Sequence, residues 1–209
     1  MENMKEFVKI ATSGNPTLTS SSTSKRIKVL DVGGNDGKVA KEHYPDSDVT
    51  TLDLKTGWDV MKFGLPFGDY NVILANHSIE HFSDPDYFLD ECKKVMNKET
   101  LLNIGTPNLT AWFNRIFFLF GYVPHSVELS KRHNVGKPFN WNKEELGGHI
   151  YVYTVPALLQ LLKHHGFKIK SVVGEASTYP ASGVVKWIDR GLTSLSPTLA
   201  SAFRVKCTI

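Results

Sequence analysis

The sequence predicts one α/β domain in which a mostly parallel β-sheet is flanked by helices. Two observations lead to this prediction: short apolar runs alternate with helical patterns, and the first apolar run ends in a glycine-rich turn. A length of 209 residues with 41% hydrophobic content suits one domain with a sizeable core. In a sheet of this kind, ligands bind at the carboxyl ends of the strands.

The first half of the chain alternates expected strands with short helical segments. Residues 27–32 form an apolar run typical of a buried strand, and a brief helix is expected around 38–43. Further strands are expected over 49–54 and 71–75, both of which are rich in β-branched and aliphatic residues. These segments predict the parallel part of the sheet.

The clearest helix begins at Pro85, where Ser83 and Asp84 can cap its N-terminus. Acidic residues stand at the N-terminus of this helix and lysines at its C-terminus, an arrangement that complements the helix dipole. Its apolar residues fall on one face: Leu89, Cys92, Val95 and Met96. A buried strand over 101–105 is expected to follow.

The last part of the chain returns to the same alternation. Thr154 is expected to cap a helix that ends at Gly166. A strand is then predicted over 168–173, an amphipathic stretch over 184–195, and a final antiparallel strand over 203–209.

Three regions follow from this pattern. Residues 1–24 include a Ser/Thr-rich run with too few apolar side chains to order itself, so they are predicted to be a flexible leader. Residues 25–209 are predicted to be one catalytic domain. Residues 106–150 interrupt the alternation and are expected to form an insertion or lid. We expect it on the side of the ligand site where a second substrate, the acceptor, would bind.

Composition excludes several classes of protein. The net charge is +3 and the basic residues are scattered, so nucleic acid is not an expected partner. Cys92 and Cys207 are too few and too far apart for a disulfide framework or a cysteine metal site. With no apolar signal segment and no membrane span, a cytoplasmic protein is expected, with peripheral membrane contact left open.

The turn after the first strand predicts a ligand site. It reads Asp-Val-Gly-Gly-Asn-Asp-Gly over 31–37, and its glycines allow the backbone to approach a ligand closely. A dinucleotide fingerprint needs glycine where Asn35 and Lys38 stand, which argues against a nicotinamide cofactor. Asp31 would repel a pyrophosphate but suits the ammonium and sulfonium charges of S-adenosylmethionine.

A second carboxylate supports the same cofactor. Asp53 ends the second expected strand, where it can accept hydrogen bonds from both hydroxyls of a ribose. Asp59 follows and is a candidate for the adenine amino group. The residues expected to bind the cofactor are Asp31, Gly33, Gly34, Asn35, Gly37, Asp53, Leu54, Asp59, Val60 and Asn76.

From Lys25 onward the chain resembles class I S-adenosylmethionine-dependent methyltransferases of the methyltransferase-11/23 type. The resemblance is carried by residues 29–33, by Asp53, by Asp59 with 65–67, and by two further segments, Ile-Glu-His-Phe at 79–82 and Gly-Thr-Pro-Asn at 105–108. It implies a Rossmann-like sheet and transfer of a methyl group from S-adenosylmethionine. It also implies that the first segment holds the methionine moiety, Asp53 the ribose and the Asp59 region the adenine.

Two departures from the family pattern stand near the expected cofactor site. Asn35 replaces the usual middle glycine, although asparagine tolerates left-handed backbone. Only five residues separate Asp53 from Asp59, which leaves little room for the helix that many relatives have there.

The acceptor side offers histidines as candidate bases. His77 follows the third long strand at its carboxyl edge, and His149 lies just before the Thr154 helix. Both are predicted catalytic residues, with packed, hydrogen-bonded histidines as the alternative. His81 is expected to be structural, and no metal site is predicted, because His164 and His165 are adjacent and lack further ligands at suitable spacing.

An aromatic helix over 111–122 lies within the expected insertion. Three interpretations remain open for it: core packing, a pocket wall for a lipophilic or aromatic small-molecule acceptor, or a membrane-surface contact. For the whole protein, two alternatives to a methyltransferase also remain: a non-catalytic S-adenosylmethionine-binding module and, less favoured, a nicotinamide-dependent oxidoreductase.

Overall fold

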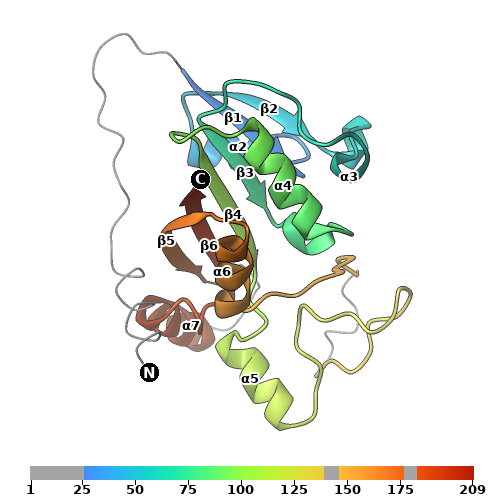
Figure 1. The fold of residues 1–209 in the computed structure, drawn as a ribbon. Helices are drawn as coiled ribbons and strands as arrows, with labels where there is room; N and C mark the ends of the chain where they lie inside the picture. The colour runs from blue at the N-terminus through green and yellow to red at the C-terminus, as the bar shows by residue number, and fades with distance from the viewer. Residues whose placement is uncertain (1–25, 139–145, 177–182) are drawn as a thin grey trace.

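A six-stranded sheet of order β2-β1-β3-β4-β6-β5 forms the centre of the computed structural model, which describes residues 26–138, 146–176 and 183–209 (Figure 1). The strands are β1 (Ile27–Val32), β2 (Ser47–Leu52), β3 (Val72–Asn76), β4 (Leu101–Pro107), β5 (Lys168–Glu175) and β6 (Ala202–Thr208). Strands β1 to β4 pair in parallel, whereas β6 is antiparallel to both β4 and β5. The predicted fold class is confirmed, including its antiparallel C-terminal strand.

Helices connect the strands and cover the sheet (Figure 1). They are α2 (Lys38–His43), α3 (Val60–Phe63), α4 (Pro85–Val95), α5 (Trp112–Leu119), α6 (Val155–His164) and α7 (Gly183–Leu195), with short 3-10 helices η1 (Leu54–Thr56) and η2 (Ile79–His81). Two of them begin as the sequence predicts. Asp84 caps α4 by accepting a hydrogen bond from the Tyr87 amide at 2.9 Å, and Thr154 caps α6.

The core has two layers, one on each face of the sheet. On the larger side, Phe88 and Leu89 of α4 and Leu158 of α6 are fully buried against side chains from β1, β3, β4 and β6. On the other side, Ala40 of α2 packs in a smaller cluster with residues of β1 and β3. Burial of each large side chain stabilises the fold by roughly 1.5–3 kcal/mol, so α4 and α6 contribute much of the stability of this face of the sheet.

The predicted strand over 49–54 is wrong at its carboxyl end. Strand β2 stops at Leu52, and Asp53 instead caps η1, which begins at Leu54. The Asp53 carboxylate accepts a hydrogen bond from the Lys55 amide, and this local bond competes with the strand ladder. The short segment between Asp53 and Asp59 therefore holds one turn of 3-10 helix, which the sequence did not predict.

Two helices turn apolar side chains outward. Core packing is the wrong interpretation for the end of α5, because Phe118 and Leu119 expose 63% and 81% of their surface. Helix α7 confirms the amphipathic stretch over 184–195, but its buried residue is Asp189, and Trp187 is 77% exposed. Within the described residues, no helix has the length and apolarity that a membrane crossing requires.

The expected leader over 1–24 and part of the expected lid, residues 139–145, lie outside the described residues. The division of the chain into leader, domain and lid stays a prediction.

Truncation of Phe88 to alanine should destabilise the protein, because it leaves a cavity between α4 and the sheet. We expect the free energy of unfolding of the Phe88→Ala variant to fall by about 3–5 kcal/mol in urea titrations followed by circular dichroism. Phe67 is 84% exposed and supplies the matched control, since Phe67→Ala should change stability by less than about 0.5 kcal/mol. Equal losses in the two variants would contradict this account of the core.

Candidate active site

The carboxyl ends of β1, β3 and β4 meet at one edge of the sheet, and the turns that follow them are bonded together. The Ser78 hydroxyl, in the turn after β3, donates to the Val32 carbonyl at the end of β1 at 2.6 Å. The His77 amide donates to the Gly105 carbonyl of β4 at 2.8 Å. Most of the residues that the sequence predicts for the site lie on these turns or on the turn after β2.

Asp31 is the next-to-last residue of β1 and has no exposed surface, and among the described residues neither of its carboxylate oxygens has a hydrogen-bond partner. The backbone of Gly34 covers this carboxylate so closely that a Cβ atom at Gly34 would lie 1.8 Å from the Asp31 Oδ2 atom. Burial, with smaller contributions from the negative charges of Asp36 and Asp53, raises the pKa of Asp31 to about 6. A cation placed here would relieve this cost.

The glycine loop takes the left-handed backbone that its sequence suggests. Asn35 has a φ of 53°, which confirms that asparagine can replace glycine at this position, and Gly33 and Gly37 have φ values of 76° and 71°. The Asn35 amide donates to Asp53 Oδ2 at 3.0 Å, so Asp53 ties the loop after β1 to the turn after β2. Because each carboxylate oxygen has two lone pairs, Asp53 can still accept from a ligand hydroxyl.

The other residues predicted on the cofactor side occupy distinct places. Leu54 projects into solvent beside Asp53, whereas the side chain of Val60 belongs to the core. Asp59 caps α3 by accepting from the Met61 amide at 3.0 Å. Asn76, at the end of β3, accepts a hydrogen bond from Arg204 at 2.8 Å.

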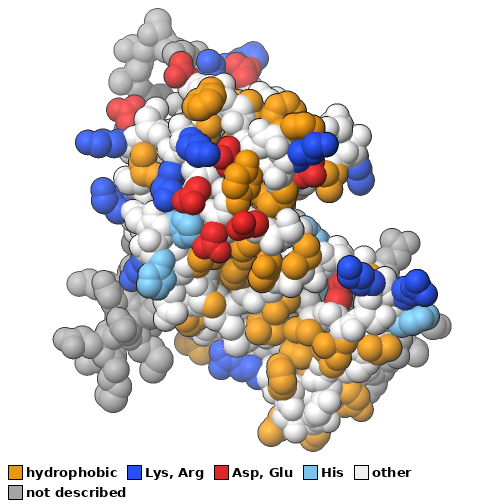
Figure 2. Space-filling view, turned by 45° about the vertical axis from the view of Figure 1, so that its right-hand side comes forward, with side chains coloured by type: hydrophobic (Ala, Val, Ile, Leu, Met, Phe, Trp, Pro, Cys, Tyr) orange, Lys and Arg blue, Asp and Glu red, His pale blue; other side chains and the backbone are white. Residues whose placement is uncertain are grey.

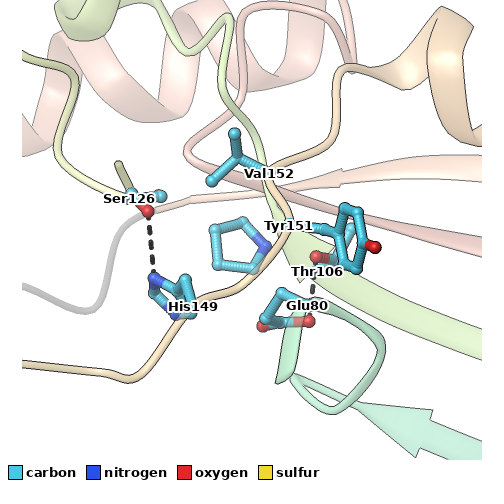
Figure 3. Close-up of a pocket in the computed structure, with 7 residues that line it drawn as sticks. Glu80, Thr106, Ser126, His149, Tyr151 and Val152 are labelled. Carbon is cyan, nitrogen blue, oxygen red and sulfur yellow. Dashed lines mark hydrogen bonds between the residues drawn. The ribbon is translucent and has the colours of Figure 1, made fainter. Parts of the chain in front are cut away.

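His77 and His149 both lie near a buried acid, Glu80, which is not among the predicted site residues. His77 has left-handed backbone, with a φ of 52°, and its Nδ1 atom lies 3.3 Å from Glu80 Oε1. Glu80 and His149 line a small pocket, whose other lining residues are Thr106, Pro107, Ser126, Tyr151 and Val152 (Figure 3). Nothing in the local sequence indicated that Glu80 is buried, because its burial comes from residues far along the chain.

The pocket is closed by the segment before α6. The amides of Ile150 and Tyr151 donate to the Glu80 carbonyl at 2.8 and 3.0 Å. His149 Nδ1 lies 3.1 Å from the Ser126 carbonyl oxygen, and burial lowers the pKa of His149 below its usual 6.5. His149 is therefore mostly neutral at pH 7.

Polar anchors hold the two loops that meet at His149. Glu128 accepts hydrogen bonds from the amides of Gly147 and Gly148, which fixes the turn that carries the histidine. His81 was expected to be only structural, yet its ring lies 5.0 Å from that of His149, centroid to centroid. The pocket therefore joins η2, β4 and two loops from distant parts of the chain.

A family model described as a methyltransferase domain matches residues 5–172, most of the chain. The chain belongs to this methyltransferase family. The fold and the family together confirm the prediction of a class I S-adenosylmethionine-dependent methyltransferase. They leave no support for the nicotinamide alternative.

Solved structures resemble the methyltransferase in fold at low identity. A SAM-dependent methyltransferase of Mesorhizobium loti has a TM-score of 0.56 at 13% identity, over 88% of this chain and 91% of its own. One from Archaeoglobus fulgidus has a TM-score of 0.51 at 14% identity, over 100% and 92%. The plantazolicin methyltransferase BpumL, solved with SAH, has a TM-score of 0.50 at 16% identity, over 88% and 77%. A sequence comparison with curated proteins gave no match.

The buried charge of Asp31 should make the stability of the methyltransferase depend on pH. Because the folded-state pKa of about 6 exceeds the ordinary 3.8, the folded state holds this proton more tightly, and stability is lost as pH rises through about 6. The Asp31→Asn variant lacks this charge. We expect its stability relative to the wild type to improve by about 2 kcal/mol between pH 4.5 and 7.5 in urea titrations.

The exposed Asp46 provides the control, because Asp46→Asn should follow the wild-type pH profile. A stability difference between Asp31→Asn and the wild type that does not change with pH would refute the assignment of a buried charge.

Proposed function

We propose that this methyltransferase transfers the methyl group of S-adenosylmethionine to a small acceptor with a lipophilic or aromatic part. The observation that supports the placement of the cofactor is the buried, unpartnered carboxylate of Asp31 beneath the glycine loop. S-adenosylmethionine carries an ammonium and a sulfonium charge, and either cation offsets the cost of ionising Asp31. Among the residues that the structure describes, no backbone or side-chain group donates a hydrogen bond to this carboxylate.

The residues at the sheet edge fit the rest of the cofactor. We place the methionine moiety over Gly33 and Gly34, of which Gly33 is exposed and Gly34 half-buried. Asp53 has lone pairs left for the ribose hydroxyls, and Leu54 offers an exposed apolar side chain to the adenine. Asp59 is placed near the adenine amino group.

The acceptor is placed at the pocket on the same edge. When bound, the cofactor supplies a methyl group on a positively charged sulfur, which leaves as a neutral thioether. The protein then needs to align the acceptor atom with that methyl group and to exclude water. We assign contact with the acceptor to His77 and His149, and His149 is neutral at pH 7, as a proton acceptor must be.

Exposed apolar surface on α5, which lies between the pocket residues Pro107 and Ser126 in the chain, favours a lipophilic acceptor. Helix α5 follows the pocket residue Pro107, and Asn114 of α5 accepts a hydrogen bond from the His125 amide, next to the pocket residue Ser126. Phe118 and Leu119 extend this helix into solvent, and Figure 2 shows apolar side chains gathered over the lower part of the molecule. Apolar surface of this kind is typical of a contact with an apolar ligand or a membrane surface.

Loss of the Asp53 charge should weaken cofactor binding. We expect the Asp53→Asn variant to bind S-adenosylhomocysteine about tenfold more weakly than the wild type in calorimetry, because a charge-assisted hydrogen bond to the ribose is lost. Asp46→Asn serves as the matched control and should bind as the wild type does. A folded wild-type protein that ignores S-adenosylhomocysteine at millimolar concentration would overturn the proposed function.

The exposed apolar surface of α5 should contribute to acceptor binding. The Phe118→Ser variant is expected to raise KM several-fold for acceptors with an alkyl or aromatic tail, without changing S-adenosylhomocysteine affinity. Methyl transfer from labelled cofactor to quinols, phenols and glycolipid precursors, each compared with a short polar analogue, measures this effect. Leu195→Ser, on α7, removes an equally exposed apolar side chain and should leave KM unchanged.

Two outcomes of that assay would count against the proposal. An unchanged KM in Phe118→Ser would exclude α5 from acceptor binding. Tight S-adenosylhomocysteine binding without turnover of any acceptor would favour the alternative of a non-catalytic binding module.

A further inference from the structure

Three possible metal ligands converge at the pocket. Glu80, His81 and His149 each offer a ligand atom, and these atoms all lie within 4.8 Å of one another. Among the residues that the structure describes, no other group of three histidine, cysteine or acidic side chains comes together in this way. Two imidazoles and one carboxylate are a ligand set that divalent transition metals accept.

Hydrogen bonds fix which nitrogen of each histidine is free. His81 Nδ1 lies 3.2 Å from the Gly148 carbonyl oxygen, and His149 Nδ1 lies 3.1 Å from that of Ser126. Because a carbonyl oxygen only accepts, both Nδ1 atoms must carry the proton, so Nε2 is the nitrogen of each ring that can bind a metal ion. Histidines that bind metals are oriented by this same kind of bond to a backbone carbonyl.

Glu80 supplies an independent observation. Its side chain is only 1% exposed, and Oε2 accepts a hydrogen bond from the Thr106 hydroxyl at 3.0 Å. Among the described residues Oε1 has no hydrogen-bond partner, and its ion-pair contact is His77 Nδ1 at 3.3 Å, which is charged only if His77 is protonated. A buried carboxylate oxygen without a donor is costly, and a cation would remove that cost. In Figure 3 the ring of His149 lies between Ser126 and Glu80.

We infer that Glu80, His81 and His149 bind a divalent transition-metal ion such as Zn²⁺, Mn²⁺ or Fe²⁺. Three ligand atoms at about 2.1 Å from one tetrahedral ion lie about 3.4 Å apart, so ligand atoms separated by up to 4.8 Å must close by as much as about 1.4 Å. Rotations of the three side chains would supply this movement. Glu128, whose Oε1 lies 3.6 Å from His149 Nδ1, adds a second negative charge beside the site.

The ion would have a role in methyl transfer, and this step rests on the proposed function. Three protein ligands leave at least one coordination position for an acceptor oxygen. Coordination lowers the pKa of a hydroxyl, so its proton passes to solvent water and the oxygen keeps the electron pair that attacks the methyl group. His149 would then act through the metal and not as a free base.

Metal binding can be measured without turnover. The full chain is stripped with a chelator and titrated with Zn²⁺ by calorimetry, with Mg²⁺ as the comparison ion. We expect one equivalent of Zn²⁺ to bind, at least 100-fold more tightly than Mg²⁺, because imidazole nitrogens favour transition metals. Glu80→Gln and His149→Gln should each weaken Zn²⁺ binding at least tenfold, and Thr106→Val should weaken it through the loss of its bond to Glu80.

His165 provides the matched control for adventitious binding. Its ring lies against two acids on the surface, with Nε2 2.7 Å from Asp86 and Nδ1 3.2 Å from Asp90. The His165→Gln variant should keep the one-equivalent Zn²⁺ site intact. Circular dichroism verifies that each variant is folded, and S-adenosylhomocysteine affinity, measured separately, should not change in any of them.

The outcomes separate the metal site from the proposed function. The metal site is wrong if the folded wild type binds no Zn²⁺, or if His165→Gln alone abolishes binding. Failure of S-adenosylhomocysteine binding with Zn²⁺ binding intact would instead refute the cofactor assignment. Retention of full methyl transfer after chelation would show that the ion has no part in the reaction and would return the role of base to His149.

Discussion

The buried charge of Asp31 beneath Gly34 is the constraint on which the cofactor side of the molecule depends. The carboxylate lies near the end of a central strand, and no group among the described residues donates to it. The loop above it can pass only because residue 34 has no side chain. The loop is held from the other direction by Asp53, which accepts the Asn35 amide. The protein thus keeps an uncompensated negative charge where a cationic ligand can neutralise it.

The acceptor side follows a different principle. Its side chains come from η2, from β4 and from two loops, and short polar contacts to backbone groups join them. The Glu80 carbonyl holds the segment before α6, and Glu128 holds the turn that carries His149. Helix α5 lies in the chain between the pocket residues Pro107 and Ser126, and Asn114 of α5 is bonded to the His125 amide. The exposed apolar side chains of α5 and these pocket residues therefore belong to one continuous segment.

Particular residues show how far the sequence could predict the molecule. The strands, the caps at Asp84 and Thr154, and the glycine turn depend on contacts within a few residues, and they were found where expected. The end of β2 was misplaced because the Asp53 side chain competes with the strand ladder for backbone donors. Helices α5 and α7 have the periodicity of core helices, but periodicity does not tell which side of a helix meets the rest of the protein.

The sequence by itself determined the fold class and the family, because the strand pattern, the glycine loop and the acids that follow β1 and β2 are local features. Only the tertiary structure decided that the Asp31 carboxylate accepts no hydrogen bond from the described residues and that Glu80 is buried. It also decided that the His81 ring lies next to the ring of His149, which is 68 positions further along the sequence. Burial and the proximity of distant residues depend on how the strands order themselves in the sheet. That order is set by the sum of many weak packing contacts, and no single segment of the sequence encodes it.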